Sequence, residues 1–111
     1  MSPITTHVLD TSRGRPAAGV PVSLEHAADS GWQTVGRGRT DADGRASDVL
    51  TSAPEDGLYR LTFDTGAYFR AVGEPAFYPE VSVTFVVEHG EEHYHVPLLL
   101  SPFGYSTYRG S

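Results

Sequence analysis

Apolar and polar residues alternate along most of this chain, with the two-residue period of a β-strand whose side chains point to opposite faces. In residues 4–10, Ile4, Thr6 and Val8 share one face, and His7 lies on the other with Thr5 and Leu9. The same kind of pattern predicts further strands at 20–26, 32–40, 46–54, 58–64, 80–88 and 93–100. Turn signals between these strands recur about every eight to twelve residues, a spacing that is typical of a β-sandwich.

Two segments depart from simple alternation. A single helix is predicted at 65–73, where alanine and phenylalanine are acceptable helix formers and Gly73 can end the helix. The chain closes with HYHVPLLLSPFGYSTYRGS, in which a Ser-Pro turn follows a strong strand signal. Termini are usually frayed. We predict instead that a tyrosine-rich strand runs to Ser111.

The strand predicted at 93–100 has one apolar face and one mixed face. The apolar face, which we assign to the core, carries Tyr94, Val96, Leu98 and Leu100. On the mixed face, His93 and His95 alternate with Pro97 and Leu99. Imidazoles beside apolar side chains suit a half-buried cleft or a contact between subunits.

Length, charge and cysteine content narrow the possible functions. The 111 residues are enough for one domain, 1–111, with a core of its own. The absence of cysteine excludes disulfides and thiolate chemistry. A formal net charge of −6, with both signs scattered, disfavours binding to nucleic acid. No signal peptide is visible and no apolar run approaches the ~20 residues of a membrane helix, so we expect a cytoplasmic protein without a membrane partner.

Few residues can carry chemistry, and each also has a structural interpretation. The candidates are His7, Arg45, His93, His95, Tyr108, Arg109 and Ser111. A histidine on a strand is more often structural, and an arginine after a D-A-D-G turn is most simply a surface residue. His93 and His95 share a strand face and could bind a metal, but only Glu91 is available as a third ligand. The set permits metal-free acid–base catalysis, in which histidine transfers protons and arginine stabilises charge.

Several motifs carry a family resemblance. They are the ending Y-R-G-S, the preceding H-Y-H-V-P-L-L-L-S-P, and T-H-V-L-D, T-D-A-D-G-R and Y-R-L-T-F-D-T-G-A-Y-F earlier in the chain. Together they resemble the 5-hydroxyisourate hydrolases, transthyretin-related enzymes of urate breakdown, over nearly the whole chain. The resemblance implies an all-β, transthyretin-like β-sandwich of two four-stranded sheets with one short α-helix. It also implies a homotetramer, a dimer of dimers, with active sites in the channel between dimers.

The resemblance further implies a reaction. This is hydrolysis of 5-hydroxyisourate to 2-oxo-4-hydroxy-4-carboxy-5-ureidoimidazoline in purine catabolism, without a metal or organic cofactor. The functional positions of the family fall on His7, Arg45, His95 and the tail residues Tyr108, Arg109, Gly110 and Ser111. His7 or His95 would act as the base, with Ser111 in relay, and Arg45 would hold the developing charge and the substrate oxygens. The choice between the two histidines is open.

Two functions other than hydrolysis are open, and hydrolysis itself requires one geometric condition. The alternative is a transthyretin-like carrier that binds small aromatic ligands in the channel between dimers; the other is a structural β-sandwich accessory domain. A carrier does not need two imidazoles and an arginine that converge. Such convergence requires the strands that carry His7, His95 and Tyr108 to be neighbours in one sheet.

Overall fold

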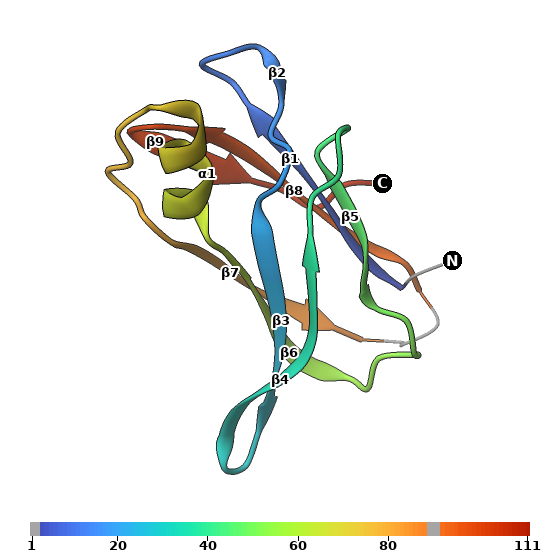
Figure 1. The fold of residues 1–111 in the computed structure, drawn as a ribbon. Coiled ribbons are helices and arrows are strands. Elements are labelled where there is room, and N and C mark those ends of the chain that lie inside the picture. The colour runs from blue at the N-terminus through green and yellow to red at the C-terminus, as the bar shows by residue number, and fades with distance from the viewer. Residues whose placement is uncertain (1–2, 89–91) are drawn as a thin grey trace.

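The computed structural model describes residues 3–88 and 92–111, which form two β-sheets and one short helix (Figure 1). The strands are β1 (Ile4–Asp10), β2 (Arg15–Pro16), β3 (Pro21–Ala28), β4 (Gly31–Arg39), β5 (Arg45–Leu50), β6 (Gly57–Phe63), β7 (Val81–Val87), β8 (Tyr94–Ser101) and β9 (Gly104–Thr107). The helix is α1 (Thr65–Val72). Apart from the two-residue β2, each sheet has four strands, so the predicted fold class is confirmed.

Strand order places β1 and β8 in the middle of one sheet. The second sheet has the order β4-β3-β6-β7, and all its pairs are antiparallel. In the first sheet β8 lies between β1 and β9, while β5 and β2 both pair with the other edge of β1. The β1–β8 pair is parallel. The strand nearest the N-terminus therefore lies against a strand from the last twenty residues.

The core lies between the sheets, and alternation along the strands predicts it well. In β1 each second residue is buried, beginning with Ile4, as the pattern predicts. Pro97 departs from the prediction, because it is buried although it lies on the mixed face of β8. The largest fully buried side chains are Phe63, Phe69, Ile4, Leu24, Leu61, Leu98, Leu100, Val8, Val20, Val49, Val81 and Val87. Within the described residues, no helix has the length and apolar character needed to span a bilayer.

The helix begins and ends where the sequence predicts. The Asp64 side chain accepts a hydrogen bond from the backbone N–H of Ala67 at 3.0 Å, which satisfies a free donor of the first turn. Gly73 follows the last helical residue with φ of 74°, a left-handed conformation that glycine adopts without a steric penalty. Tyr68 and Phe69 lie on the buried face of the helix.

A buried carboxylate joins this helix to β1. The Tyr68 hydroxyl donates to Asp10 Oδ2 at 2.6 Å, and Asp10 Oδ1 accepts from Ser12 and from the backbone N–H of Arg13. Burial alone would raise the pKa of Asp10, but the hydrogen bonds from Tyr68, Ser12 and Arg13 outweigh it and lower that pKa. Burial and the hydrogen bond to Asp10 raise the pKa of Tyr68 to about 12. Both groups thus keep their usual charge states at neutral pH.

Tyr68→Phe is expected to lower the free energy of unfolding by about 1–3 kcal/mol at pH 7, because Asp10 Oδ2 loses its buried donor. The lowered pKa of Asp10 means that its ionised form stabilises the fold above the unfolded pKa, near 3.8, and that this stability is lost as pH falls below it. The cost of the substitution should therefore be smaller at pH 3 than at pH 7. Urea unfolding at both pH values measures it. Tyr105→Phe, at an exposed tyrosine, is the control and should cost little at either pH.

The C-terminal strand ends earlier than predicted. β9 stops at Thr107, and pairing with β8 resumes only at Gly110, which bridges His95 in the same register. The gap begins opposite Pro97, which has no backbone N–H to donate to a neighbouring strand. Thr107 Oγ1 instead donates to the carbonyl of Pro97 at 2.7 Å. The prediction of a continuous strand to Ser111 is therefore wrong beyond Thr107.

Candidate active site

Three adjacent strands bring the predicted catalytic residues together. The parallel β1–β8 pair places Thr5 beside His95 and His7 beside Pro97. On the other edge of β1, β5 places Arg45 beside His7. The condition that the strands of His7 and His95 are neighbours in one sheet is confirmed. β9 pairs with the other edge of β8, but it ends at Thr107, so Tyr108 follows this strand instead of lying in it.

An open hollow of about 520 Å³ lies on this face of the sheet. Each residue of its lining carries a polar or charged group; these residues are Thr5, Thr6, Arg45, Ser47, His93, His95 and Ser111. Figure 1 shows the C-terminal segment ending beside β5, in agreement with this lining. Three predicted site residues, Arg45, His95 and Ser111, thus border one space. His7 is next to Arg45 along the sheet but does not line the hollow.

The turn before Arg45 is fixed by hydrogen bonds to Asp41 and by close packing of Gly44 on β1. Asp41 Oδ1 accepts from the backbone N–H of Asp43 at 2.9 Å and from that of Arg45 at 3.0 Å. Gly44 has φ of 77°, and a Cβ there would lie 2.4 Å from the carbonyl oxygen of Val8. The turn therefore packs on β1 more closely than a side chain at this position would permit.

His7 supports this turn. Its Nε2 lies 2.9 Å from the carbonyl oxygen of Asp43. A carbonyl only accepts hydrogen bonds, so Nε2 of His7 carries a hydrogen in this arrangement. His7 therefore holds the turn that carries Arg45, and its Nε2 is not free to accept a proton.

His95 has the features of a proton acceptor. Its Nδ1 lies 2.8 Å from Thr5 Oγ1, and among the described residues its Nε2 has no hydrogen-bond partner. Burial lowers the pKa of His95, and the nearby charges of His93, His7 and Arg45 lower it further. The imidazole is therefore neutral at pH 7, with a ring nitrogen available.

Gly110 forms a wall against the His95 ring. Its backbone N–H donates to the carbonyl of His95 at 2.8 Å. A Cβ on Gly110 would lie 2.6 Å from Cδ2 of His95, closer than real contacts permit. Only glycine lets the tail lie directly against this ring and bring Ser111 to the hollow.

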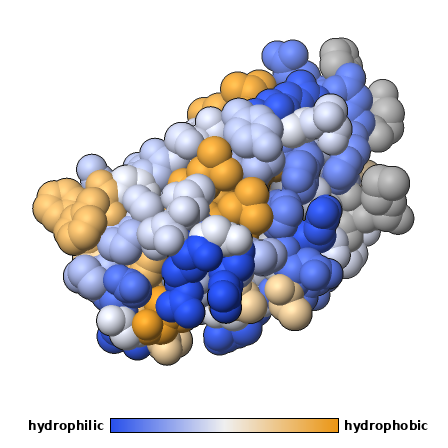
Figure 2. All heavy atoms as spheres, turned by 90° about the horizontal axis from the view of Figure 1, so that it is seen from above, coloured by the Kyte–Doolittle hydropathy of each residue, from blue (hydrophilic) through white to orange (hydrophobic). Residues whose placement is uncertain are grey.

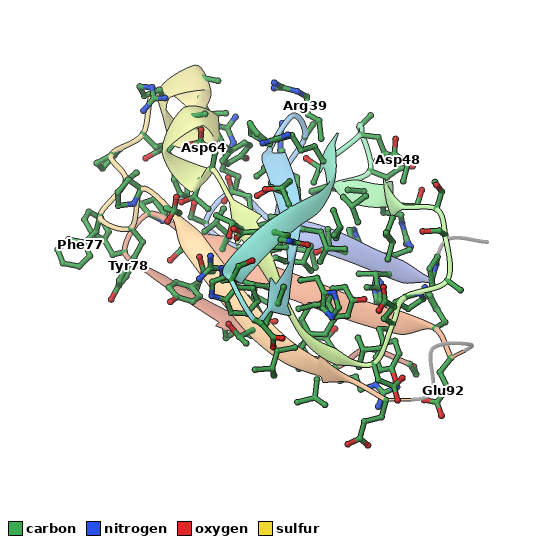
Figure 3. All side chains as sticks on the ribbon, turned by 90° about the horizontal axis from the view of Figure 1, so that it is seen from below. Arg39, Asp48, Asp64, Phe77, Tyr78 and Glu92 are labelled. Atoms are coloured by element: carbon green, nitrogen blue, oxygen red, sulfur yellow. The ribbon has the colours of Figure 1, made fainter. Side chains whose placement is uncertain are left out.

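Tyr108 and Arg109 lie on a second, mostly apolar hollow of about 310 Å³, between the tail and β7. The Arg109 guanidinium stacks 4.7 Å from the Tyr94 ring centroid and pairs with Glu92 at 3.4 Å. Glu92 lies at the end of the molecule opposite Phe77 and Tyr78 (Figure 3). His95 borders both hollows, but within one chain Tyr108 and Arg109 do not share a hollow with Arg45 and Ser111. Their part in substrate binding stays a prediction.

The structure adds three residues to the sequence candidates. Thr5, Thr6 and Ser47 line the polar hollow but are not among those candidates. The signal for Thr5 was its place on the same strand face as His7. In the described part of the chain, no group of three or more histidine or carboxylate side chains is arranged to hold a metal ion. Glu91, the third ligand considered for a metal, lies outside the described residues.

Comparison with known proteins supports one family. A profile of the HIUase/transthyretin family matches residues 4–110. A 5-hydroxyisourate hydrolase from Salmonella dublin is 48% identical over 109 residues, which cover 97% of this chain and 80% of the relative. The solved 5-hydroxyisourate hydrolase of Klebsiella pneumoniae is 40% identical with a TM-score of 0.84, and covers 100% of this chain and 94% of its own.

Transthyretin itself is also similar. The structure of sea bream transthyretin in complex with thyroxine has a TM-score of 0.91 at 34% identity, and covers 97% of this chain and 94% of its own. Hydrolases and transthyretin thus share one backbone fold, and the side chains of the site must distinguish them. The family profile and the identity over almost the full length establish that this chain belongs to the HIUase/transthyretin family.

Proposed function

We propose that this protein hydrolyses 5-hydroxyisourate, the reaction for which its Salmonella and Klebsiella relatives are named. Water would open the six-membered ring at an N–C(=O) bond. The observation that carries this proposal is the position of the half-buried imidazole of His95, whose Nε2 has no hydrogen-bond partner among the described residues, beside a hollow that Arg45 also lines. Burial lowers the pKa of His95, which favours the neutral form. When water attacks a carbonyl, the reaction needs a base to take the proton of the water and a positive charge to stabilise the oxygen.

His95 is better placed than His7 to act as the base. Water that attacks the carbonyl carbon must lose a proton, and His95 Nε2 can accept it. The Arg45 guanidinium can stabilise the negative charge that develops on the carbonyl oxygen. Because His7 Nε2 is engaged with the Asp43 carbonyl, we assign His7 to holding the turn of Arg45. Ser111 at the rim supplies a hydroxyl within the same hollow.

A carrier of small aromatic ligands is the second candidate, and the likeness to thyroxine-bound sea bream transthyretin favours it. Two observations favour the hydrolase. Among the solved structures, identity to the Klebsiella hydrolase is 40% against 34% to that transthyretin. The larger of the two hollows that His95 borders also contains a second histidine, an arginine and hydroxyl side chains, which binding of an aromatic ligand does not require.

An ultraviolet assay separates the two functions. 5-Hydroxyisourate is generated in the cuvette by urate oxidase, and its decay is followed with and without the purified protein. We expect the protein to accelerate the decay well above the spontaneous rate. Decay at the spontaneous rate, together with saturable binding of thyroxine, would instead establish a carrier.

We further propose that the protein is a homotetramer, a dimer of dimers, whose sites face the channel between dimers. Support comes from the open hollow and from large apolar side chains that the single chain leaves exposed, such as Phe103 at 68% and Tyr108 at 57%. On the face shown in Figure 2, hydrophobic areas lie in the middle and at one end of a mostly hydrophilic surface. Light scattering after size exclusion tests the assembly. Location in the cytoplasm stays a prediction.

Arg45→Lys is expected to lower kcat/KM about 10- to 100-fold, less than the roughly 100- to 1,000-fold loss in kcat that follows outright removal of an oxyanion donor. Lysine keeps the positive charge but loses the planar fork that can hold two oxygens. Because Arg45 is exposed, the free energy of unfolding should change little. The ultraviolet assay measures the effect, with Arg37→Lys on the exposed face of β4 as the matched control. Equal kcat/KM in the two variants would show that Arg45 is only a surface residue after a turn.

A further inference from the structure

We propose that Thr5 and His93 extend His95 into a proton relay, in which the Thr5 hydroxyl passes a proton between the half-buried imidazole of His95 and the exposed imidazole of His93. This inference rests on the proposed hydrolysis, because it gives the route of the proton that His95 removes from water. It gives a role in proton transfer to Thr5, which lines the hollow, and to His93, which precedes β8.

The Thr5 hydroxyl lies between two imidazole nitrogens. Its Oγ1 is 2.8 Å from Nδ1 of His95 and 3.0 Å from Nε2 of His93, and both distances are those of hydrogen bonds. The parallel register of β1 and β8 makes this possible, because it sets Thr5 directly beside His95. A hydroxyl has one hydrogen, so it donates to one nitrogen and accepts from the other. The tautomers of the two histidines are therefore coupled.

Only one arrangement leaves His95 as a base toward the substrate. A lone pair on Nε2 of neutral His95 requires the hydrogen on Nδ1, which then donates to Thr5 Oγ1. The Thr5 hydroxyl in turn donates to Nε2 of His93, whose own hydrogen is on Nδ1. Every hydrogen bond in the chain then points from His95 toward His93, which is the direction in which a proton would travel.

The transfer balances without any further reactant. As water attacks the carbonyl carbon, His95 Nε2 takes one proton from it. The Nδ1 proton of His95 moves to Thr5 Oγ1, and the original hydroxyl proton of Thr5 moves to His93 Nε2. His95 and Thr5 are then neutral, and His93 is the cation. When the C–N bond breaks, His95 gives its Nε2 proton to the leaving nitrogen, and the two other protons move back. All three residues regain their starting states.

The surroundings of the two histidines favour this direction. His95 is half-buried, and it faces His7 from β1 and Arg45 from β5, so a positive charge on it is disfavoured. His93 is exposed to water, which stabilises a cation. Arg45 lines the same hollow as His93, and Glu92, the residue before His93, pairs with Arg109 at 3.4 Å. The relay thus moves the charge from the less favourable to the more favourable site during the lifetime of the intermediate.

Thr5→Val tests the relay, because valine keeps the shape of threonine and removes the hydroxyl. We expect kcat for 5-hydroxyisourate to fall about 10- to 100-fold with little change in KM, a loss of the size seen when the hydrogen-bond partner of a metal-binding histidine is removed. Thr5→Ser restores the hydroxyl and should restore most of kcat. In mixtures of H2O and D2O, the rate of the parent should depend on D2O content along a curve, because several protons move together, and that of Thr5→Val should be closer to linear.

His93→Gln provides the second variant, at an exposed position where folding is not at risk. Glutamine can accept from Thr5 but cannot hold the proton, so kcat should fall, and adding Thr5→Val should cause little further loss because both act in one unit. The relay is wrong if Thr5→Val or His93→Gln keeps the kcat and the isotope curve of the parent, or if Thr5→Ser does not restore kcat. Inactive parent protein would contradict the proposed hydrolysis instead.

Discussion

His95→Gln is expected to lower kcat for 5-hydroxyisourate by about 100-fold or more, the contribution that general base catalysis usually makes. Glutamine is close in size to histidine and can still bond to Thr5, but its amide cannot accept a proton from water. KM should change less than kcat, because Arg45 and the rest of the hollow remain. The ultraviolet assay at saturating substrate measures the effect.

The pH profile of the parent gives an independent check. A base works in its neutral form, and the pKa of His95 lies below its ordinary value of 6.5, chiefly because of burial. The acid limb of kcat/KM that belongs to His95 should therefore have its midpoint below 6.5. In the parent, His93 must also be neutral to accept the relayed proton, so the residual activity of His93→Gln, which removes that requirement, should show the limb of His95 alone. His26→Gln, on β3 and away from the hollow, is the control and should keep the parent kcat and profile. Near-normal turnover by His95→Gln would show that another group is the base.

Deletion of residues 108–111 is expected to abolish hydrolysis while the sandwich still folds. The deletion removes the wall that Gly110 forms against His95 and takes Ser111 from the hollow. Loss of a wall lets the imidazole move, and a displacement of about 1 Å at a catalytic group can cost about 100-fold. Circular dichroism and the unfolding midpoint should change little, because none of the four residues is buried.

Gly110→Ala tests the same wall with one added carbon. Its Cβ would lie 2.6 Å from Cδ2 of His95, so either the ring or the tail must shift. We expect a clear loss of kcat with unchanged far-ultraviolet dichroism. Gly104→Ala, where the nearest contact of a new Cβ is an ordinary 3.7 Å, is the matched control and should be active. A truncated protein with full activity would place the site elsewhere.

Local pattern predicts those parts of the fold that depend on local chemistry. The alternation in 4–10 predicts which side of β1 is buried, and Asp64 and Gly73 bound the helix as capping rules require. The tail was predicted incorrectly because a tyrosine-rich alternation was extended past the point where pairing is possible. Pro97 was visible in the sequence, but its partner across the sheet was not, and only the register shows that it interrupts the ladder.

Sequence motifs predict only some of the residues around the hollow, because the partners of a strand across the sheet are not visible in the sequence. Motifs pointed to His95, Arg45 and Ser111, which border one hollow in the structure. Thr5 has no motif of its own, because any polar residue fits that position of an alternating strand. The role that we propose for Thr5 rests on the parallel register with β8, which sets its hydroxyl between two imidazoles. Such a contact between residues 88 and 90 positions apart cannot be inferred from either strand alone.

The parallel pairing of β1 with β8 also determines when the site can form during synthesis. The ribosome makes Thr5 90 residues before His95, which at typical rates of 5–20 residues per second is a delay of roughly 5 to 20 s. During that time β1 has no central partner, and one of its edges is open to other nascent chains. All strands of the second sheet, β4-β3-β6-β7, are synthesised before β8, so β1 can pack against the apolar face of that sheet. During synthesis the polar hollow can therefore form only after β8 has emerged, and a chain that stalls before β8 lacks His93, His95 and Ser111 and leaves one edge of β1 unpaired.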